Sequence, residues 1–140
     1  MNSSQPVPRT DLTALAGRTA TLTHVVTEAD SARQWGNDID VLATPVLLWL
    51  SEIAAMKVLG DAVTEPSMTV GLSHASQHLA PTPTGDTVTL TAELTAVEGR
   101  RLVFDVVGHD SLDTVLRGQH ERAVVDRTRF VEKLAHRTHS

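Results

Sequence analysis

The 140-residue chain contains no cysteine, so disulfide scaffolds, thiol catalysis, thiolate zinc sites and iron–sulfur clusters are excluded. Aromatic residues make up only 3% of the chain, so its core must consist mainly of Val, Leu, Ala and Thr. No apolar run approaches the roughly 20 residues that a membrane-spanning helix needs. Residues 1–10 lack a basic segment followed by an apolar one, so we expect no signal peptide and a cytoplasmic protein.

A basic surplus is also missing, because the net charge is −5 with histidine neutral. This charge argues against a nucleic-acid partner bound by bulk electrostatics, and no membrane partner is expected. A local basic element remains in the C-terminal half, and it is either a solvated face or a phosphate-binding surface. Its members are Arg100, Arg101, Arg117, Arg122, Arg127 and Arg129.

The clearest element is a helix predicted over residues 44–59. Thr44 is a favourable N-cap, Pro45 fits the first helical position, and Gly60 is a natural stop. Apolar residues surround most of this helix instead of forming one stripe, which is typical of a helix buried on several sides.

Most of the remaining chain has the alternating pattern of half-buried strands. Strands are predicted over residues 17–27, 67–79, 87–97, 101–108 and 114–126, with a loop over residues 28–43. One helix followed by consecutive hairpins predicts an α+β fold in which an antiparallel sheet wraps the helix. We expect one domain over residues 17–130, a flexible tail over 1–16 and a polar tail over 131–140.

Three residue types in this framework can carry chemistry. Glu52 lies within the most apolar helix, and a charged residue there either sits at a wet edge or has a function. His74 and His78 share one face of a predicted strand, but no third ligand with convincing spacing appears, so no metal site is predicted. Thr44 is either only a cap or a group that binds a developing oxyanion or a reacting water at the helix N-terminus.

Thr44 and Glu52 are eight residues apart, about 12 Å along a helix axis, and cannot touch each other. Either a third group such as His78 lies between them, or they act on different parts of one substrate, or a partner chain supplies one of them. The sequence contains no serine elbow, Walker loop or dinucleotide-binding glycine motif.

Several stretches together resemble the fluoroacetyl-CoA thioesterase family of hot-dog proteins. They are DVLATPVLLWLSEIAAMKVL, GLSHASQHLAPTPTGDTVTLTAEL, VEGRRL and GQHERAVV, within a resemblance that covers residues 17–130. The resemblance implies a homodimeric hot-dog fold, a long helix wrapped by about five antiparallel strands, an acyl-CoA substrate and no cofactor.

The resemblance also implies site residues. The catalytic Thr, Glu and His fall on Thr44, Glu52 and His78, and His78 is selected over His74 by its spacing to the TPTG turn. A substrate-binding glycine falls on Gly71, and an arginine that contacts the ligand falls on Arg122.

One departure from the family concerns the loop before the helix. The fluoroacetyl-specific enzyme carries phenylalanines there as an apolar lid, whereas the matching positions here are Trp35 and Asp38. Trp35 remains an expected substrate contact. A carboxylate is a poor gate for a carbon–fluorine group, so we expect a different acyl preference.

The expected reaction is hydrolysis of a small acyl-CoA thioester near the dimer interface. The carbonyl would lie near Gly71 and the helix N-terminus, and Glu52 would attack it or activate water. His78 would move the proton, Thr44 would orient His78, and Arg122 would bind the CoA arm. The alternatives are a non-catalytic ligand-binding protein, a dehydratase or hydratase, and hydrolysis of a carrier-protein thioester.

Overall fold

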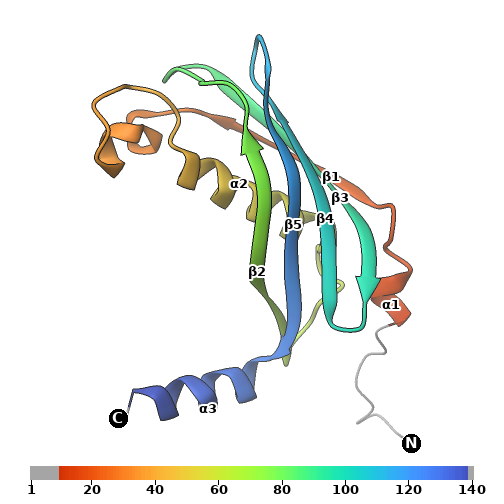
Figure 1. Cartoon of the computed structure of the whole chain (residues 1–140). Helices are drawn as coiled ribbons and strands as arrows, with labels where there is room; N and C mark the ends of the chain where they lie inside the picture. The colour runs from red at the N-terminus through yellow and green to blue at the C-terminus, as the bar shows by residue number, and fades with distance from the viewer. Residues whose placement is uncertain (1–9, 139–140) are drawn as a thin grey trace, which may run out of the picture.

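A computed structural model of the protein describes residues 10–138. At its centre lies α2 (Thr44–Leu59), and a five-stranded antiparallel sheet curls around it (Figure 1). The strands are β1 (Thr19–Val25), β2 (Ser67–His78), β3 (Thr87–Glu98), β4 (Arg101–His109) and β5 (Thr114–Asp126). Their spatial order is β1-β3-β4-β5-β2, so β1 and β2 form the two edges. The predicted α+β architecture is confirmed.

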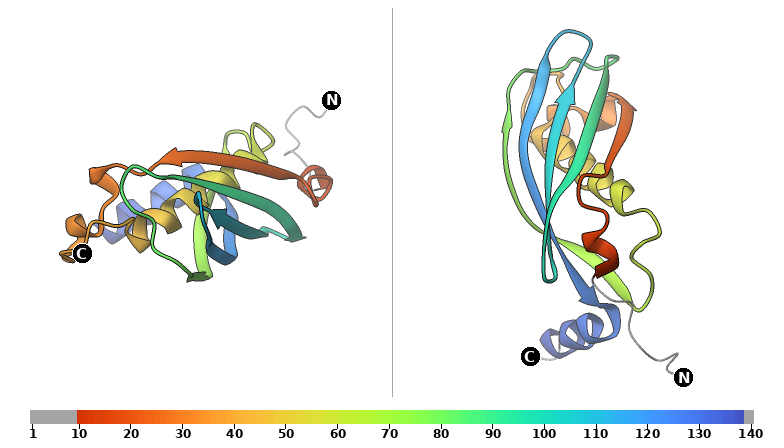
Figure 2. Two further views of the ribbon diagram at one scale, coloured as in Figure 1. Left: turned by 90° about the horizontal axis from the view of Figure 1, so that it is seen from above. Right: turned by 90° about the vertical axis from the view of Figure 1, so that its right-hand side faces the viewer.

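The curved sheet covers one side of α2, while Trp49 and Met56 of this helix remain 56% and 41% exposed. Seven of its apolar residues are buried, namely Val46, Leu47, Leu50, Ala54, Ala55, Val58 and Leu59. Inward-facing side chains of β3 and β4, such as Leu90, Leu94 and Phe104, are fully buried in the same core. Figure 2 shows the sheet as a curved layer along one side of this helix.

The N-terminus of α2 differs from the prediction in one respect. Ala43 is the N-cap and makes no side-chain capping bond, while Thr44 is the first helical residue, so the predicted N-cap role of Thr44 is wrong. Pro45 lies in the first turn, and Gly60 ends the helix with a positive φ of 54°. Because the Thr44 hydroxyl is not used in capping, it is available for another partner.

The edge strand β2 positions most of the residues of interest. It pairs with β5 on one side, with a register shift between Gly71 and Ser73. Among the residues that the structure describes, no strand pairs with its other side. Two short 3-10 helices, η1 (Glu28–Asp30) and η2 (Ala32–Trp35), lie in the loop between β1 and α2.

Short helices lie near both predicted boundaries of the domain. Residues 1–9 of the expected N-terminal tail lie outside the described part, but α1 (Thr10–Thr13) carries Leu12 into the core, so the fold begins before residue 17. At the other end, α3 (Arg127–Arg137) crosses the predicted boundary at residue 130 and points away from the sheet (Figure 1). Over residues 10–138, none of the helices combines the length and the apolarity needed to cross a bilayer.

Candidate active site

The helix α2 and the edge strand β2 touch through two polar contacts. Near the start of the helix, Thr44 Oγ1 lies 2.7 Å from His78 Nδ1. Two turns further on, Glu52 Oε2 lies 2.9 Å from His74 Nε2. The distance from Thr44 to Glu52 along the helix is about 12 Å, and the distance from His78 to His74 along the strand is about 13 Å. Because these distances are nearly equal and the two elements run antiparallel, both contacts can form at once.

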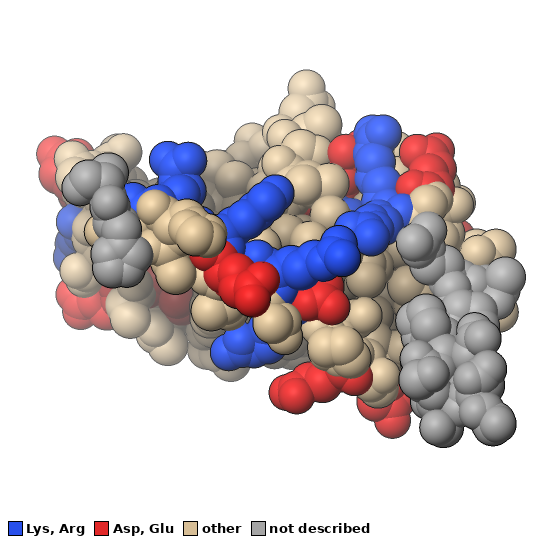
Figure 3. Space-filling view, turned by 90° about the horizontal axis from the view of Figure 1, so that it is seen from below, with Lys and Arg blue, Asp and Glu red and all other residues tan. Residues whose placement is uncertain are grey.

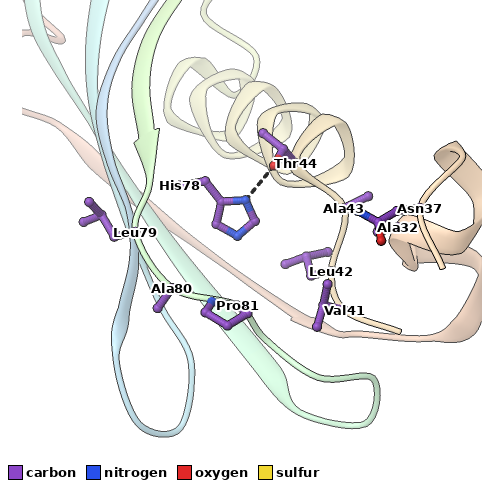
Figure 4. A pocket seen from close by; sticks show the side chains of 10 residues that line it. All are labelled: Ala32, Asn37, Val41, Leu42, Ala43, Thr44, His78, Leu79, Ala80 and Pro81. Atoms are coloured by element: carbon purple, nitrogen blue, oxygen red, sulfur yellow. Dashed lines mark hydrogen bonds between the residues drawn. The ribbon is translucent and has the colours of Figure 1, made fainter. Parts of the chain in front are cut away.

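The first contact lies in a pocket of about 360 Å³, the lower part of the size range of small-molecule sites. Figure 4 shows the His78 ring reaching between Thr44 and an aliphatic wall. The lining residues are Ala32, Asn37, Val41, Leu42, Ala43, Thr44, His78, Leu79, Ala80 and Pro81. Since none of these carries a fixed charge, the pocket suits an uncharged group beside one hydroxyl and one imidazole.

Burial lowers the pKa of His78, more than the nearby backbone of Ala80 raises it. The ring is therefore neutral at pH 7 and can accept a proton. Its Nε2 is buried and makes no hydrogen bond to the residues that the structure describes. If Nδ1–H donates to the Thr44 oxygen, Nε2 keeps its lone pair and is the nitrogen that can act as a base.

The second contact belongs to a denser group of charged and polar side chains. Arg122 Nη1 donates to Glu52 Oε1 at 3.0 Å, while His74 approaches the other carboxylate oxygen. Arg122 is only 4% exposed, and its remaining donors bind the side chain and the carbonyl of Thr69. Burial raises the pKa of Glu52, but the hydrogen bonds from His74 and Arg122 outweigh it and hold the pKa below its ordinary value.

His120 completes this group from β5. It is the cross-strand partner of His74, and the two rings stack with centroids 4.2 Å apart. His120 Nδ1 lies 2.9 Å from the carbonyl of Ser73, and Nε2 lies 3.1 Å from Arg122 Nη1. Because a guanidinium only donates, Nε2 accepts and Nδ1 carries the proton. Burial lowers the pKa of His120, in agreement with this neutral form.

Glu52, His74 and His120 could in principle ligate a metal ion, because their ligand atoms lie within 4.8 Å of one another. The third possible ligand, His120, was not predicted from the sequence. However, Arg122 Nη1 contacts both Glu52 and His120, so a guanidinium already supplies the positive charge between them. A divalent cation would have to displace a buried arginine, which argues against a metal at this place.

Gly71 lies against the same carboxylate. A Cβ atom at this position would stand 3.2 Å from Glu52 Oε1, so the absence of a side chain lets the carboxylate approach the strand. Gly71 is also the cross-strand partner of Arg122. The predicted residues Glu52, Gly71 and Arg122 therefore come together in one place.

Of the three alternatives for Thr44 and Glu52, a His78 that bridges them within one chain is not the arrangement in the structure. His78 contacts Thr44, and His74, which the resemblance had set aside, contacts Glu52. Sequence reasoning also missed His120, although His120 and Arg122 alternate on one face of a strand in the stretch HERAVV. That alternation was the available signal.

The loop before α2 brings other residues to the pocket than Trp35 and Asp38. Trp35 is 59% exposed, and neither Trp35 nor Asp38 is among the residues lining the pocket, whereas Ala32 and Asn37 are. The pocket wall is thus formed by neighbours of the two positions that the resemblance indicated.

Basic residues gather at the end of the molecule that bears α3 and the turn between β3 and β4. In Figure 3, Lys and Arg side chains run across this face with Asp and Glu side chains between them. Arg101 is paired with Glu121 through two hydrogen bonds of 2.6 and 3.0 Å. Part of this basic element is therefore engaged within the chain.

Comparison with known proteins gives a consistent result. The family model described as fluoroacetyl-CoA-specific thioesterase matches residues 26–128. The fluoroacetyl-CoA thioesterase of Streptantibioticus cattleyicolor is 38% identical over 99 residues, which are 71% of this chain and 71% of that protein. A solved structure of the fluoroacetyl-CoA thioesterase has a TM-score of 0.82 at 32% identity, covering 89% of this chain and 96% of the other. A hot-dog-like protein from Thermanaerovibrio acidaminovorans reaches 0.85 at 25% identity, over 93% and 98%.

The wrapped helix and these likenesses define a thioester hydrolase of the hot-dog fold. Within that class, the chain belongs to the fluoroacetyl-CoA-specific thioesterase family. The resemblance found in the sequence is thereby confirmed, and so are the fold and the type of enzyme that it implied.

Proposed function

We propose that the protein hydrolyses a small, uncharged acyl-CoA thioester, with the acyl group in the pocket beside Thr44 and His78. The observation that carries this proposal is the pocket itself, where one hydroxyl, one neutral imidazole and the Asn37 amide lie in an otherwise aliphatic wall. The relatives, which are named as fluoroacetyl-CoA thioesterases, support a CoA ester as the substrate.

The complete site is proposed to form between two copies of the chain. Thr44 and Glu52 are about 12 Å apart along α2, too far for one thioester carbonyl to contact both. Within residues 10–138 no strand pairs with the outer side of the edge strand β2, and Leu72 on β2 is exposed. If two β2 strands pair antiparallel about an axis near His74 and Ala75, His78 of one chain lies opposite Gly71 of the partner. Glu52, which lies against Gly71, would then face the partner's pocket.

In this arrangement the thioester carbonyl lies at the N-terminus of α2, where the positive end of the helix dipole stabilises the oxyanion. Glu52 from the partner either attacks the carbonyl carbon or takes a proton from the attacking water. In both cases the C–S bond breaks, water supplies the new oxygen of the acid, and CoA leaves as a thiol after protonation. His78 moves that proton, and Thr44 holds His78.

The role proposed for Arg122 changes from that of a CoA ligand to that of a residue holding Glu52. Its guanidinium is buried, and its contacts are to Glu52, Thr69 and His120. For the CoA phosphates we propose exposed arginines instead, such as Arg117 on β5. We place the reaction in the cytoplasm, because the charged phosphates keep an acyl-CoA from crossing a bilayer.

Acyl preference is proposed to differ from that of the fluoroacetyl-specific relatives. The exposed Trp35 stays a proposed contact of the substrate outside the pocket, and Asp38 does not provide an apolar gate. Asn37 instead offers an amide at the pocket wall (Figure 4). We therefore expect fluoroacetyl-CoA to have no advantage over other short acyl-CoA esters.

A thiol-release assay tests the proposal on a series of acyl-CoA esters of increasing length and on matching carrier-protein thioesters. Short, uncharged CoA esters are expected to be the best substrates, and Glu52→Gln is expected to lower kcat/KM by at least ~10²-fold. Glu93→Gln, which changes an exposed acid on β3, is the matched control. Release unaffected by Glu52→Gln contradicts the proposed site, and binding of esters without release indicates a ligand-binding protein.

A further inference from the structure

Glu52 is held from two strands at once, by Arg122 of β5 and by His74 of β2. We propose that His74 is a positioning residue for Glu52, fixing the direction in which the carboxylate faces the substrate. This inference rests on the proposed function, because it assigns Glu52 to the reaction.

The geometry gives each carboxylate oxygen its own donor. Arg122 Nη1 lies 3.0 Å from Oε1, and His74 Nε2 lies 2.9 Å from Oε2. The Glu52 side chain is 32% exposed, so one side of the carboxylate stays open between these donors. With a single donor the carboxylate could rotate about its terminal bond, a torsion with a broad energy well. Two donors from different strands remove that freedom.

His74 is itself fixed by its neighbour across the sheet. Its ring lies nearly parallel to that of His120, at an interplanar angle of 14°. His120 is fully buried, with one nitrogen on the Ser73 carbonyl and the other on Arg122. The stacked ring of His74 therefore rests on a side chain that has no freedom to turn.

The position of its two nitrogens makes His74 a donor and not the reacting base. Nε2 faces the carboxylate, so the proton shared with Glu52 lies on that nitrogen. Nδ1 is buried and has no hydrogen-bond partner among the described residues, and Nε2 is occupied by the Glu52 carboxylate. We therefore assign to His74 a role that acts through Glu52.

The electrostatic consequence concerns the acid side of the pH profile. The groups that face Glu52 are His74 from β2 and Arg122 and His120 from β5. Burial raises the pKa of Glu52, and the His74 hydrogen bond is the largest effect that lowers it. Without this donor, Glu52 takes up a proton at higher pH, and activity is lost sooner as the pH falls.

Two variants distinguish the contribution of the His74 N–H donor from that of the His74 ring. His74→Phe keeps an aromatic ring for stacking on His120 but lacks the N–H, whereas His74→Gln keeps an amide N–H at a similar reach. We expect His74→Phe to lower kcat/KM by about tenfold, the loss expected for one hydrogen bond to a charged group, and to move the acid limb to higher pH. His74→Gln should restore the position of that limb. His109→Phe, at an exposed histidine of β4, is the control and should change neither.

The proposal fails if His74→Phe leaves both the rate and the acid limb unchanged. If that variant does not fold, His74→Met provides the same test without a donor. Failure of the proposed function is a different result, because Glu52→Gln would then keep full activity.

In that case an NMR titration of the Glu52 carboxyl carbon still tests the effect of His74 on the Glu52 pKa. A titration midpoint that is the same with and without the His74 donor overturns the proposal, and a higher midpoint without it supports the proposal.

Discussion

The two contacts between α2 and β2 have opposite characters. The Thr44–His78 contact lies in an open, mainly aliphatic pocket, and His78 Nε2 has no hydrogen-bond partner in the described part of the chain. The Glu52 group is crowded and charged, and both carboxylate oxygens are engaged. The first contact leaves room for a ligand, while the second keeps one carboxylate ionised and oriented. The same helix and strand thus form a pocket for the acyl group at one end and hold the Glu52 carboxylate about two helical turns away.

The largest loss of stability is expected from removing Arg122, the buried cation beside Glu52. Arg122→Met leaves Glu52, His120 and Thr69 without their common donor. The variant should lose about 3–5 kcal/mol of unfolding free energy, as expected when one member of a buried pair is removed, and activity should fall with it. Denaturant unfolding measures the change.

The matched control is Arg117→Met on the same strand, where the side chain is exposed. Its expected loss is below about 0.5 kcal/mol. Equal losses for both variants would show that burial of Arg122 beside Glu52 contributes nothing special to stability.

A second prediction concerns the open pocket. His78→Gln should lower kcat by about 10²-fold with little loss of stability, because it removes a proton carrier from a site that is not tightly packed. Thr44→Val should have a smaller effect of about tenfold, since it removes only the hydroxyl that holds His78. Single-turnover kinetics measure the loss of rate, and thermal unfolding measured in parallel shows whether stability is retained. A His78→Gln enzyme with wild-type kcat would remove His78 from the mechanism.

A third prediction is a loss of stability in mild acid. Burial lowers the pKa values of His78 and His120 in the folded chain. Below the ordinary histidine value the unfolded chain therefore binds more protons, so stability is full above that pH and decreases as the pH falls below it. The urea midpoint should fall between pH 7 and pH 5. His78→Gln should reduce this fall, and a midpoint that rises instead would contradict the neutral state of both rings.

The smallest effect is expected from chelators. Arg122 supplies the cation beside Glu52 and His120, so treatment with EDTA should change kcat/KM by less than about twofold. Added Zn²⁺ should not increase the rate. A chelator-sensitive enzyme restored by a divalent metal would mean that the three possible ligands do bind an ion.

Much of the fold follows from local patterns. The helix over residues 44–59 was predicted with its observed bounds because Pro45 and Gly60 mark its ends. The strands follow their alternation, and the observed bounds of β5 are those predicted. The N-cap was placed one residue late, since Thr is a good cap and nothing local indicates that Ala43 takes the position.

The partners of Glu52 could not be predicted from its own surroundings. Residues His74 and His78 lie on the same face of β2, so alternation does not distinguish them. The choice depends on which end of the helix each strand residue meets, and this is a property of the antiparallel packing of α2 on β2. His120 becomes a neighbour of His74 only through the pairing of β2 with β5.

The measurement that tests the central claim most directly is complementation between two inactive variants. If Glu52 of one chain serves Thr44 and His78 of the partner, a mixed dimer of Glu52→Gln and His78→Gln chains contains one intact site and one doubly altered site. Random mixing should then restore about a quarter of wild-type thioester hydrolysis, because half of the dimers are mixed and each has one intact site. Activity no higher than the sum of the two separate variants would contradict a site shared between chains.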